Sequence, residues 1–126
     1  MHTNEHELDA LVSETVGAAY EVGNILGCGF LEKVYHRALL RELRLRRLPT
    51  QSEAAFPVRY KGQHVGDYIA DIVVGGHLVV ELKCAEVLSN EHMAQCINYL
   101  KASGLKLALL INFQHPKVEW KRIIFG

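Results

Sequence analysis

Apolar residues in the first third of the chain recur at the three- and four-residue spacing of amphipathic helices. One such stripe covers residues 8–26 and is broken by the glycine turn at 27–29. A second helix is predicted over residues 31–47, ending before Pro49. Because only a short glycine turn separates the two helices, we expect them to pack as an antiparallel or steeply angled pair.

The remainder of the chain has the pattern of strands interrupted by one helix. Strands are predicted at 55–60, 64–74, 78–84, 107–111 and 118–125. Pro57 places the first of them at a sheet edge. Ser89 or Asn90 can cap a helix that runs to Ser103 and ends at Gly104. The continuous apolar run at 107–111 is typical of a strand covered on both faces.

This order of elements predicts an α/β fold with a mixed sheet: two N-terminal helices, a three-strand meander, a crossover helix and two final strands. The 126 residues fit one domain over residues 1–126. No apolar run approaches the roughly 18 residues of a membrane span. The polar start of the chain has no signal-peptide core, so we expect a cytoplasmic protein without a membrane partner. Three cysteines without a C-x-x-C spacing argue against a disulfide framework or a structural zinc site.

Ionisable residues lie in the middle of two apolar runs of the meander: Asp71 in the first, and Glu81 and Lys83 in the second. Removing an ion from water costs several kcal/mol unless it is paired. Glu81 and Lys83 are two residues apart and therefore share one face of their strand. A three-residue turn at 75–77 would place Asp71 directly opposite Glu81, whereas a two-residue turn would place it on the other face. We predict the three-residue turn, or a bulge with the same effect.

Two explanations fit these charges. A structural salt bridge leaves one carboxylate uncompensated, because Asp71, Glu81 and Lys83 sum to −1. Glu32 lies on the flank of the apolar face of the second helix, and if it reaches the sheet the cluster carries −2. A divalent cation with oxygen ligands neutralises that charge, and Mg²⁺ or Mn²⁺ suits it. Carboxylates on a cation beside a lysine are the groups that metal-assisted hydrolysis requires.

The motif continues onto the crossover helix, where Gln95 and Tyr99 share one face. Asp71, the Glu-Leu-Lys at 81–83, and Gln95-x3-Tyr99 together resemble the PD-(D/E)xK nuclease superfamily. The segment 29–35 reads G-x-x-E-x-x-Y and is similar to the signature of the small bacterial and archaeal GxxExxY proteins of that superfamily. The similarity covers nearly the whole chain.

The resemblance implies a PD-(D/E)xK nuclease-like α/β/α core and a role for each matching position. Asp71 and Glu81 match the metal-binding acids, and Lys83 matches the catalytic lysine. Glu32 matches the acid of the family's first helix, and we include it among the metal ligands. The chain departs from the family at Gly23, where His is frequent. The implied site residues are Glu32, Asp71, Glu81, Lys83, Gln95 and Tyr99.

The sequence therefore predicts a Mg²⁺- or Mn²⁺-dependent nuclease that hydrolyses phosphodiester bonds in nucleic acid, with DNA favoured. Fourteen basic and fourteen acidic side chains cancel, so any phosphate contact must come from a local patch or a bound cation. The alternative is a non-catalytic nucleic-acid or protein-binding module that keeps the fold. The small size favours that alternative or a homodimer.

Two groups of basic residues differ in their expected surroundings. On the second helix a basic stripe points away from the apolar face, and we interpret it as a solvated surface. The basic residues of the crossover helix and the last strands are the better candidates for phosphate contact. The stripe consists of Lys33, Arg37, Arg41, Arg44 and Arg47, and the second group of Lys101, Lys106, Lys117, Lys121 and Arg122.

Overall fold

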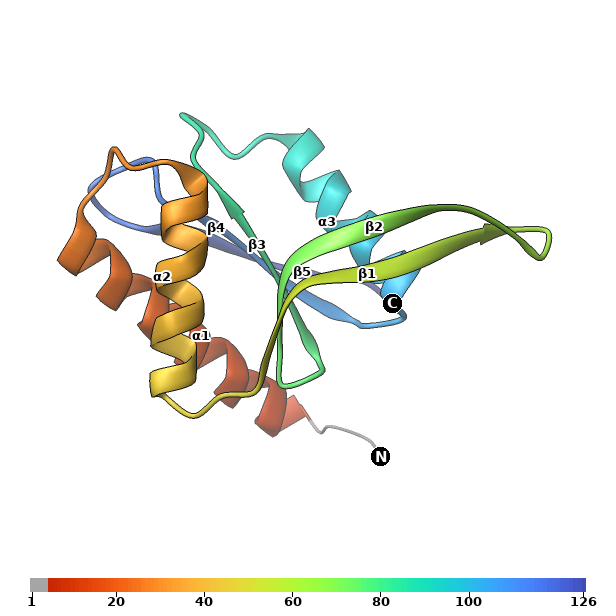
Figure 1. The fold of residues 1–126 in the computed structure, drawn as a ribbon, viewed down its shortest axis with the longest axis horizontal. Coiled ribbons are helices and arrows are strands. Elements are labelled where there is room, and N and C mark those ends of the chain that lie inside the picture. Colours follow the sequence, from red (N-terminus) through yellow and green to blue (C-terminus); the bar gives the residue numbers. More distant parts are fainter. Residues whose placement is uncertain (1–4) are drawn as a thin grey trace.

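The computed structural model describes residues 5–126, in which three helices and five strands follow the predicted order (Figure 1). The elements are α1 (Glu5–Leu26), α2 (Glu32–Leu45), β1 (Thr50–Tyr60), β2 (Gln63–Val74), β3 (Leu78–Lys83), α3 (Asn90–Ser103), β4 (Leu107–Asn112) and β5 (Glu119–Ile124). The predicted α/β fold with a mixed sheet is confirmed. No helix of the described residues is long and apolar enough to cross a membrane.

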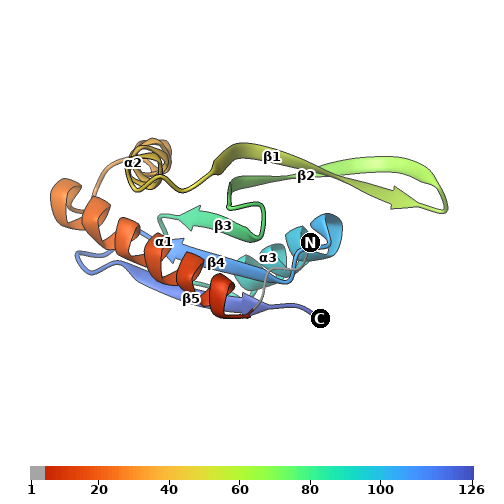
Figure 2. The same cartoon turned by 90° about the horizontal axis from the view of Figure 1, so that it is seen from below.

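The five strands form one sheet in the order β1-β2-β3-β4-β5. Only β3 and β4 are parallel, because α3 carries the chain across the sheet between them. α1 and α2 cover one face of the sheet and α3 covers the other (Figures 1 and 2). Side chains of α1 and α2 pack in the core on the first face, and those of α3 pack in the core on the second. All six residues of β4 are buried, as expected for a strand covered on both faces.

The connection between β2 and β3 is the predicted three-residue turn. Val74 pairs with Leu78, and the His77 N–H donates to the Val74 carbonyl at 3.2 Å. Gly75 and Gly76 have positive φ, which explains why the turn needs glycine at both positions.

β1 begins at Thr50, earlier than the predicted strand at 55–60. Its first residues are polar and lack the alternation that marks a half-buried strand. In the structure they lie beside α2, where Arg44 Nε donates to Thr50 Oγ1 at 3.2 Å. The hydroxyl of Ser52 lies 3.1 Å from His36 Nε2. Contacts with a distant helix thus extend the strand beyond what its own sequence indicates.

The predicted caps of α3 are both present. Ser89 Oγ accepts from the His92 N–H at 3.3 Å, and the Ser89 N–H donates to His92 Nδ1 at 3.1 Å. Gly104 ends the helix in the left-handed conformation, with φ of 76°. His92 therefore belongs to the N-terminal cap of α3. The bond to the Ser89 N–H explains the position of its ring as a structural one.

α1 approaches the segment before β5 closely at Gly23, and substitution there is expected to be costly. A Cβ atom at position 23 would lie 2.5 Å from Val118 Cγ2. Gly23→Ala should lower the free energy of unfolding by about 1–2 kcal/mol, since overpacking outweighs the helix propensity gained. Urea denaturation measures this change.

Gly17→Ala is the matched control within the same helix. Its Cβ would meet only the end of the flexible Arg46 side chain, 3.0 Å from Nη1. We expect this variant to be unchanged or up to about 1 kcal/mol more stable. Equal stability of the two variants would contradict the packing of α1 on Val118.

Candidate active site

The backbone pairing between β2 and β3 ends at Ile72 and Val80. Beyond this pair, the carboxyl groups of Asp71 and Glu81 accept hydrogen bonds from backbone N–H groups of the opposite strand. The Asp71 N–H donates to Glu81 Oε1 at 2.8 Å. The Leu82 N–H donates to Asp71 Oδ2 at 2.8 Å. The two strands therefore separate where the acids lie, and one oxygen of each acid is fixed by a backbone donor.

The side-chain alternation of β2 also breaks at this point. Ala70 and Val73 both pack in the core beside α3, whereas Ile72 packs in the core beside α1 and α2. A spacing of three between residues on one face means that one residue is bulged. Opposite Asp71, Glu53 of β1 has a positive φ of 53°, a conformation that is rare for a non-glycine residue. Past this bend the β1–β2 hairpin extends toward α3 (Figure 1).

Burial raises the pKa of all three acids of the cluster, and the charge of Asp71 adds to the shift at Glu32 and Glu81. Glu81 is 3% exposed, and desolvation followed by the charge of Asp71 raises its pKa to about 8. Desolvation also raises the pKa of Asp71, partly offset by the Leu82 N–H. The pKa of Glu32, the first residue of α2, is raised by loss of water around its carboxyl group and then by Asp71. The site therefore favours a proton or a cation beside these groups.

Lys83 is the last residue of β3 and shares a face with Glu81. Its charge lowers the pKa of Glu32, Asp71 and Glu81, so it lies within electrostatic reach of all three. Among residues 5–126, however, no ion pair involves Lys83. The direct salt bridge that would explain these charges as purely structural is not formed in this part of the chain.

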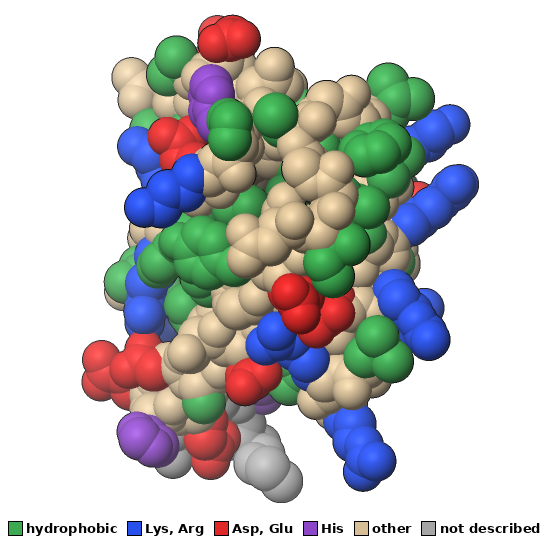
Figure 3. Space-filling view, turned by 90° about the vertical axis from the view of Figure 1, so that its left-hand side faces the viewer, with side chains coloured by type: hydrophobic (Ala, Val, Ile, Leu, Met, Phe, Trp, Pro, Cys, Tyr) green, Lys and Arg blue, Asp and Glu red, His purple; other side chains and the backbone are tan. Residues whose placement is uncertain are grey.

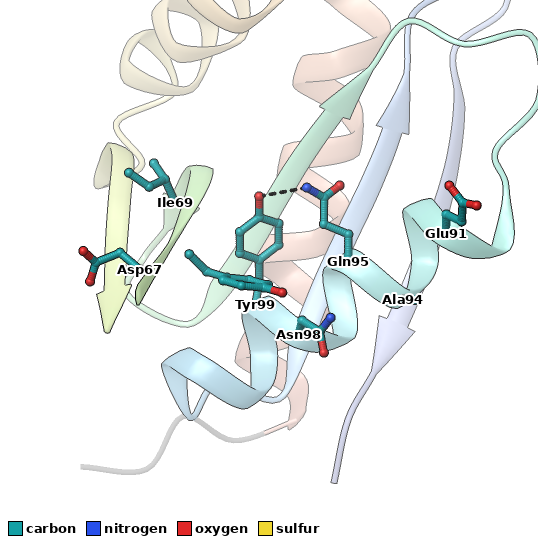
Figure 4. A pocket seen from close by; sticks show the side chains of 8 residues that line it. Asp67, Ile69, Glu91, Ala94, Gln95, Asn98 and Tyr99 are labelled. Carbon is teal, nitrogen blue, oxygen red and sulfur yellow. Dashed lines mark hydrogen bonds between the residues drawn. The ribbon is translucent and has the colours of Figure 1, made fainter. Parts of the chain in front are cut away.

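Gln95 and Tyr99 border the cluster from α3. Gln95 Nε2 donates to the Tyr99 hydroxyl at 3.3 Å, and the two side chains point toward one another (Figure 4). Burial, then Glu81 and Asp71, raise the pKa of the Tyr99 phenol, which therefore keeps its proton at neutral pH. Both residues line a cavity of about 520 Å³ between α3 and β2, with Ile69 on the opposite wall (Figure 4).

The donor set of the cluster suits a hydrated divalent cation. The described residues, 5–126, contain no three His, Cys, Asp or Glu side chains placed to hold a metal ion together. Mg²⁺ keeps several of its waters and is usually bound by one or two carboxylates. Asp71 and Glu81 meet that requirement, because backbone N–H groups occupy only one oxygen of each. Glu32 does not complete a three-ligand set in this arrangement.

A family comparison agrees with the geometry. The family described as the PD-(D/E)XK nuclease superfamily matches residues 9–123. The chain belongs to this superfamily. The match runs from α1 into β5 and so includes all six residues of the expected site. The sequence has no match among curated proteins.

Solved structures share the fold of this PD-(D/E)XK chain at low sequence identity. The crystal structure of SSO0001 has a TM-score of 0.60 and 16% identity, covering 73% of this chain and 48% of that one. An alkaline exonuclease, LHK-Exo from Laribacter hongkongensis, has a TM-score of 0.55 and 11% identity over 100% of this chain and 73% of its own. Its complex with dAMP has a TM-score of 0.51 and 12% identity, covering 91% and 83%. The chain thus spans about half the length of SSO0001, and these identities show the fold alone.

Tyr35 holds the start of α2 against the PD-(D/E)XK core, a role that sequence reasoning did not assign. Its hydroxyl donates to the Gly27 carbonyl at 2.6 Å and accepts from the Phe30 N–H at 3.2 Å. The buried ring stacks on Phe113 with centroids 4.7 Å apart. These contacts fix the loop before α2 and thereby place Glu32. The G-x-x-E-x-x-Y motif was the available signal, because it pairs the acid with this tyrosine.

Asn112 fixes the segment that follows Lys83, and it too was missed. Its amide donates to the Ala85 carbonyl at 2.7 Å and accepts from the Ala85 N–H at 3.0 Å. The side chain is fully buried at the end of β4, beside Lys83 in the parallel register. A polar residue that ends an otherwise apolar strand was the signal for it.

Proposed function

We propose that the protein is a metal-dependent nuclease that hydrolyses phosphodiester bonds in nucleic acid, with DNA favoured as the substrate. The observation that carries this proposal is the convergence of Asp71 and Glu81 where β2 and β3 separate, with Lys83 on the same face. Membership of the nuclease superfamily supports it. A structural neighbour named as an alkaline exonuclease, also solved with dAMP, supports nucleic acid as the substrate class.

Each residue of the cluster has a role that follows from its placement. Asp71 and Glu81 would hold Mg²⁺ or Mn²⁺ through the oxygens that the backbone donors leave open. A cation bound there supplies a water of lowered pKa and neutralises charge on a phosphate oxygen. Lys83 orients the attacking water or offsets charge that develops on the phosphorus. Glu32 adds negative charge beside the pair and strengthens its attraction for the cation.

Gln95 and Tyr99 would position the substrate strand beside the carboxylates. Both are neutral hydrogen-bonding groups, because the raised pKa of the Tyr99 phenol keeps its proton in place. The amide of Gln95 and this hydroxyl can each donate to a phosphate oxygen. The cavity that they line, between α3 and β2, would receive the part of the strand next to the cluster.

Cleavage of labelled nucleic acid tests the proposal directly. The purified protein is incubated with single- and double-stranded DNA and RNA in Mg²⁺, Mn²⁺ or EDTA. We expect cleavage in either metal and none in EDTA, with DNA cleaved faster than RNA. Binding without cleavage under every condition would favour the non-catalytic module that keeps the nuclease fold.

A further inference from the structure

The basic stripe of α2 lies beside a second cavity, on the β1 side of the candidate active site. The five residues of the stripe are exposed, in agreement with the sequence interpretation, and basic side chains form a row down one edge of the molecule (Figure 3). Three of them, Lys33, Arg37 and Arg44, also line a cavity of about 370 Å³ between α2 and β1. Part of the stripe is therefore the wall of a pocket, which a helical wheel alone does not reveal.

The charges of this pocket are strongly unbalanced. Three basic side chains face a single carboxylate, that of Glu53. Within residues 5–126, no ion pair involves Lys33, Arg37 or Arg44. Like charges gathered around one cavity repel one another unless an anion separates them. The pocket is thus electrostatically suited to an anion.

Hydrogen bonds orient some of the donor side chains that line the pocket. Arg44 Nε is tied to Thr50 Oγ1, which orients the rest of its guanidinium group. His36 and Ser52 line the wall and lie 3.1 Å apart through Nε2 and Oγ. Guanidinium, ammonium and hydroxyl groups together are the donors that bind phosphate oxygens.

Two of its lining residues connect the pocket to the acids of the active site. His36 interacts electrostatically with both Asp71 and Glu32. Glu53 interacts with Asp71 and lies opposite it at the bend of the β1–β2 hairpin. An anion in the pocket would therefore lie beside the phosphodiester bond that is cleaved at Asp71 and Glu81.

We propose that the pocket formed by α2 and β1 binds a phosphate group of the nucleic-acid substrate, next to the bond that is cleaved. The inference rests on the proposed nuclease function and adds the phosphate subsite to it. The phosphate is either an internal diester of the strand or its terminal monoester, and both present the same oxygens to the pocket. In this proposal Lys33, Arg37 and Arg44 of the α2 stripe contact phosphate, whereas the sequence favoured the basic residues of α3 and the last strands for that contact.

Binding of labelled oligonucleotides in EDTA tests this subsite without requiring hydrolysis. Fluorescence anisotropy at about 0.1 M ionic strength compares the parent with Arg37→Ala and with Arg41→Ala. Arg41 lies on the same helix and is also exposed, but it does not line the pocket. We expect Arg37→Ala to raise Kd by roughly tenfold. The slope of log Kd against log salt concentration should fall by about one, because one phosphate contact is lost. Arg41→Ala should change Kd by less than about twofold.

Oligonucleotides with and without a terminal phosphate show whether the pocket binds a terminal monoester or an internal diester. If Arg37→Ala loses affinity only for the phosphorylated strand, the bound group is a terminal monoester. If it loses affinity equally for both strands, the bound group is an internal diester. Arg37→Lys, which keeps the charge, should recover part of the affinity.

Equal effects of Arg37→Ala and Arg41→Ala would overturn the subsite, because they would show a diffuse charge effect. Unchanged affinity in Arg37→Ala would overturn it as well, as would a parent protein that binds neither strand. A protein that binds through the pocket but never cleaves in Mg²⁺ or Mn²⁺ would instead refute the proposed nuclease activity and leave the phosphate site standing.

Discussion

Lys83→Ala is expected to lower the rate of metal-dependent cleavage by roughly a hundredfold to a thousandfold. This is the loss measured when one preorganised group that stabilises transition-state charge is removed. The substitution leaves the Lys83 backbone and its bond from the Phe113 N–H in place, so the fold should persist. Single-turnover cleavage at saturating Mg²⁺ measures the chemical step, and circular dichroism checks the fold.

Lys61→Ala is the matched control for this prediction. It removes the same charge from an exposed lysine in the turn between β1 and β2, at the far end of that hairpin from Asp71. We expect its cleavage rate to stay within about twofold of the parent. A Lys83→Ala protein that cleaves as fast as the parent would assign the activity to other residues or to a contaminant.

The elements were predictable because hydrophobic periodicity is a local signal. The local sequence allowed a two- or a three-residue turn between β2 and β3, and the three-residue turn was predicted because it places Asp71 opposite Glu81. The pairing of Val74 with Leu78 confirms that register. α3 matched its predicted bounds, since Ser89 and Gly104 act on neighbouring residues alone.

Features that depend on distant contacts were not predictable in this way. The separation of β2 from β3 at Asp71 arises because side-chain carboxyls replace backbone acceptors, and no spacing rule encodes that exchange. The early start of β1 depends on its contacts with α2. The helical wheel correctly placed Arg37 away from the core, yet it could not show that β1 forms a pocket beside it.

The metal-free protein is expected to lose stability as the pH rises from about 5 to about 8.5. The pKa of Glu81 is about 8 in the folded protein, against an ordinary value of 4.5. Between those values the folded state holds a proton that the unfolded state has released. This contribution to stability is complete below the unfolded pKa and disappears as the pH rises through the folded pKa. The free energy of unfolding in EDTA should fall by roughly 2–4 kcal/mol over this range.

Glu81→Gln isolates that contribution from the other titrating groups. The amide oxygen of Gln can still accept the Asp71 N–H, and the side chain no longer ionises. The fall in stability from pH 5 to 8.5 should therefore be smaller in Glu81→Gln than in the parent, and the variant should be the more stable protein at the upper pH. Glu21→Gln, at an exposed position of α1, should follow the parent. Urea denaturation of the three proteins in EDTA measures these slopes.

Mg²⁺ should act in the opposite direction on the parent at high pH. Binding to the ionised carboxylates stabilises the folded state by about 2.7 kcal/mol at a hundredfold excess over Kd. The stability of Glu81→Gln should change little with Mg²⁺, because the variant lacks one of the two carboxylates proposed to bind the ion. A structural role for the charges predicts the reverse: Glu81→Gln would lose its charge interaction with Lys83 and would be less stable than the parent at pH 8.5. Lower stability of the variant in EDTA at pH 8.5, with no Mg²⁺ response in the parent, would refute the metal site.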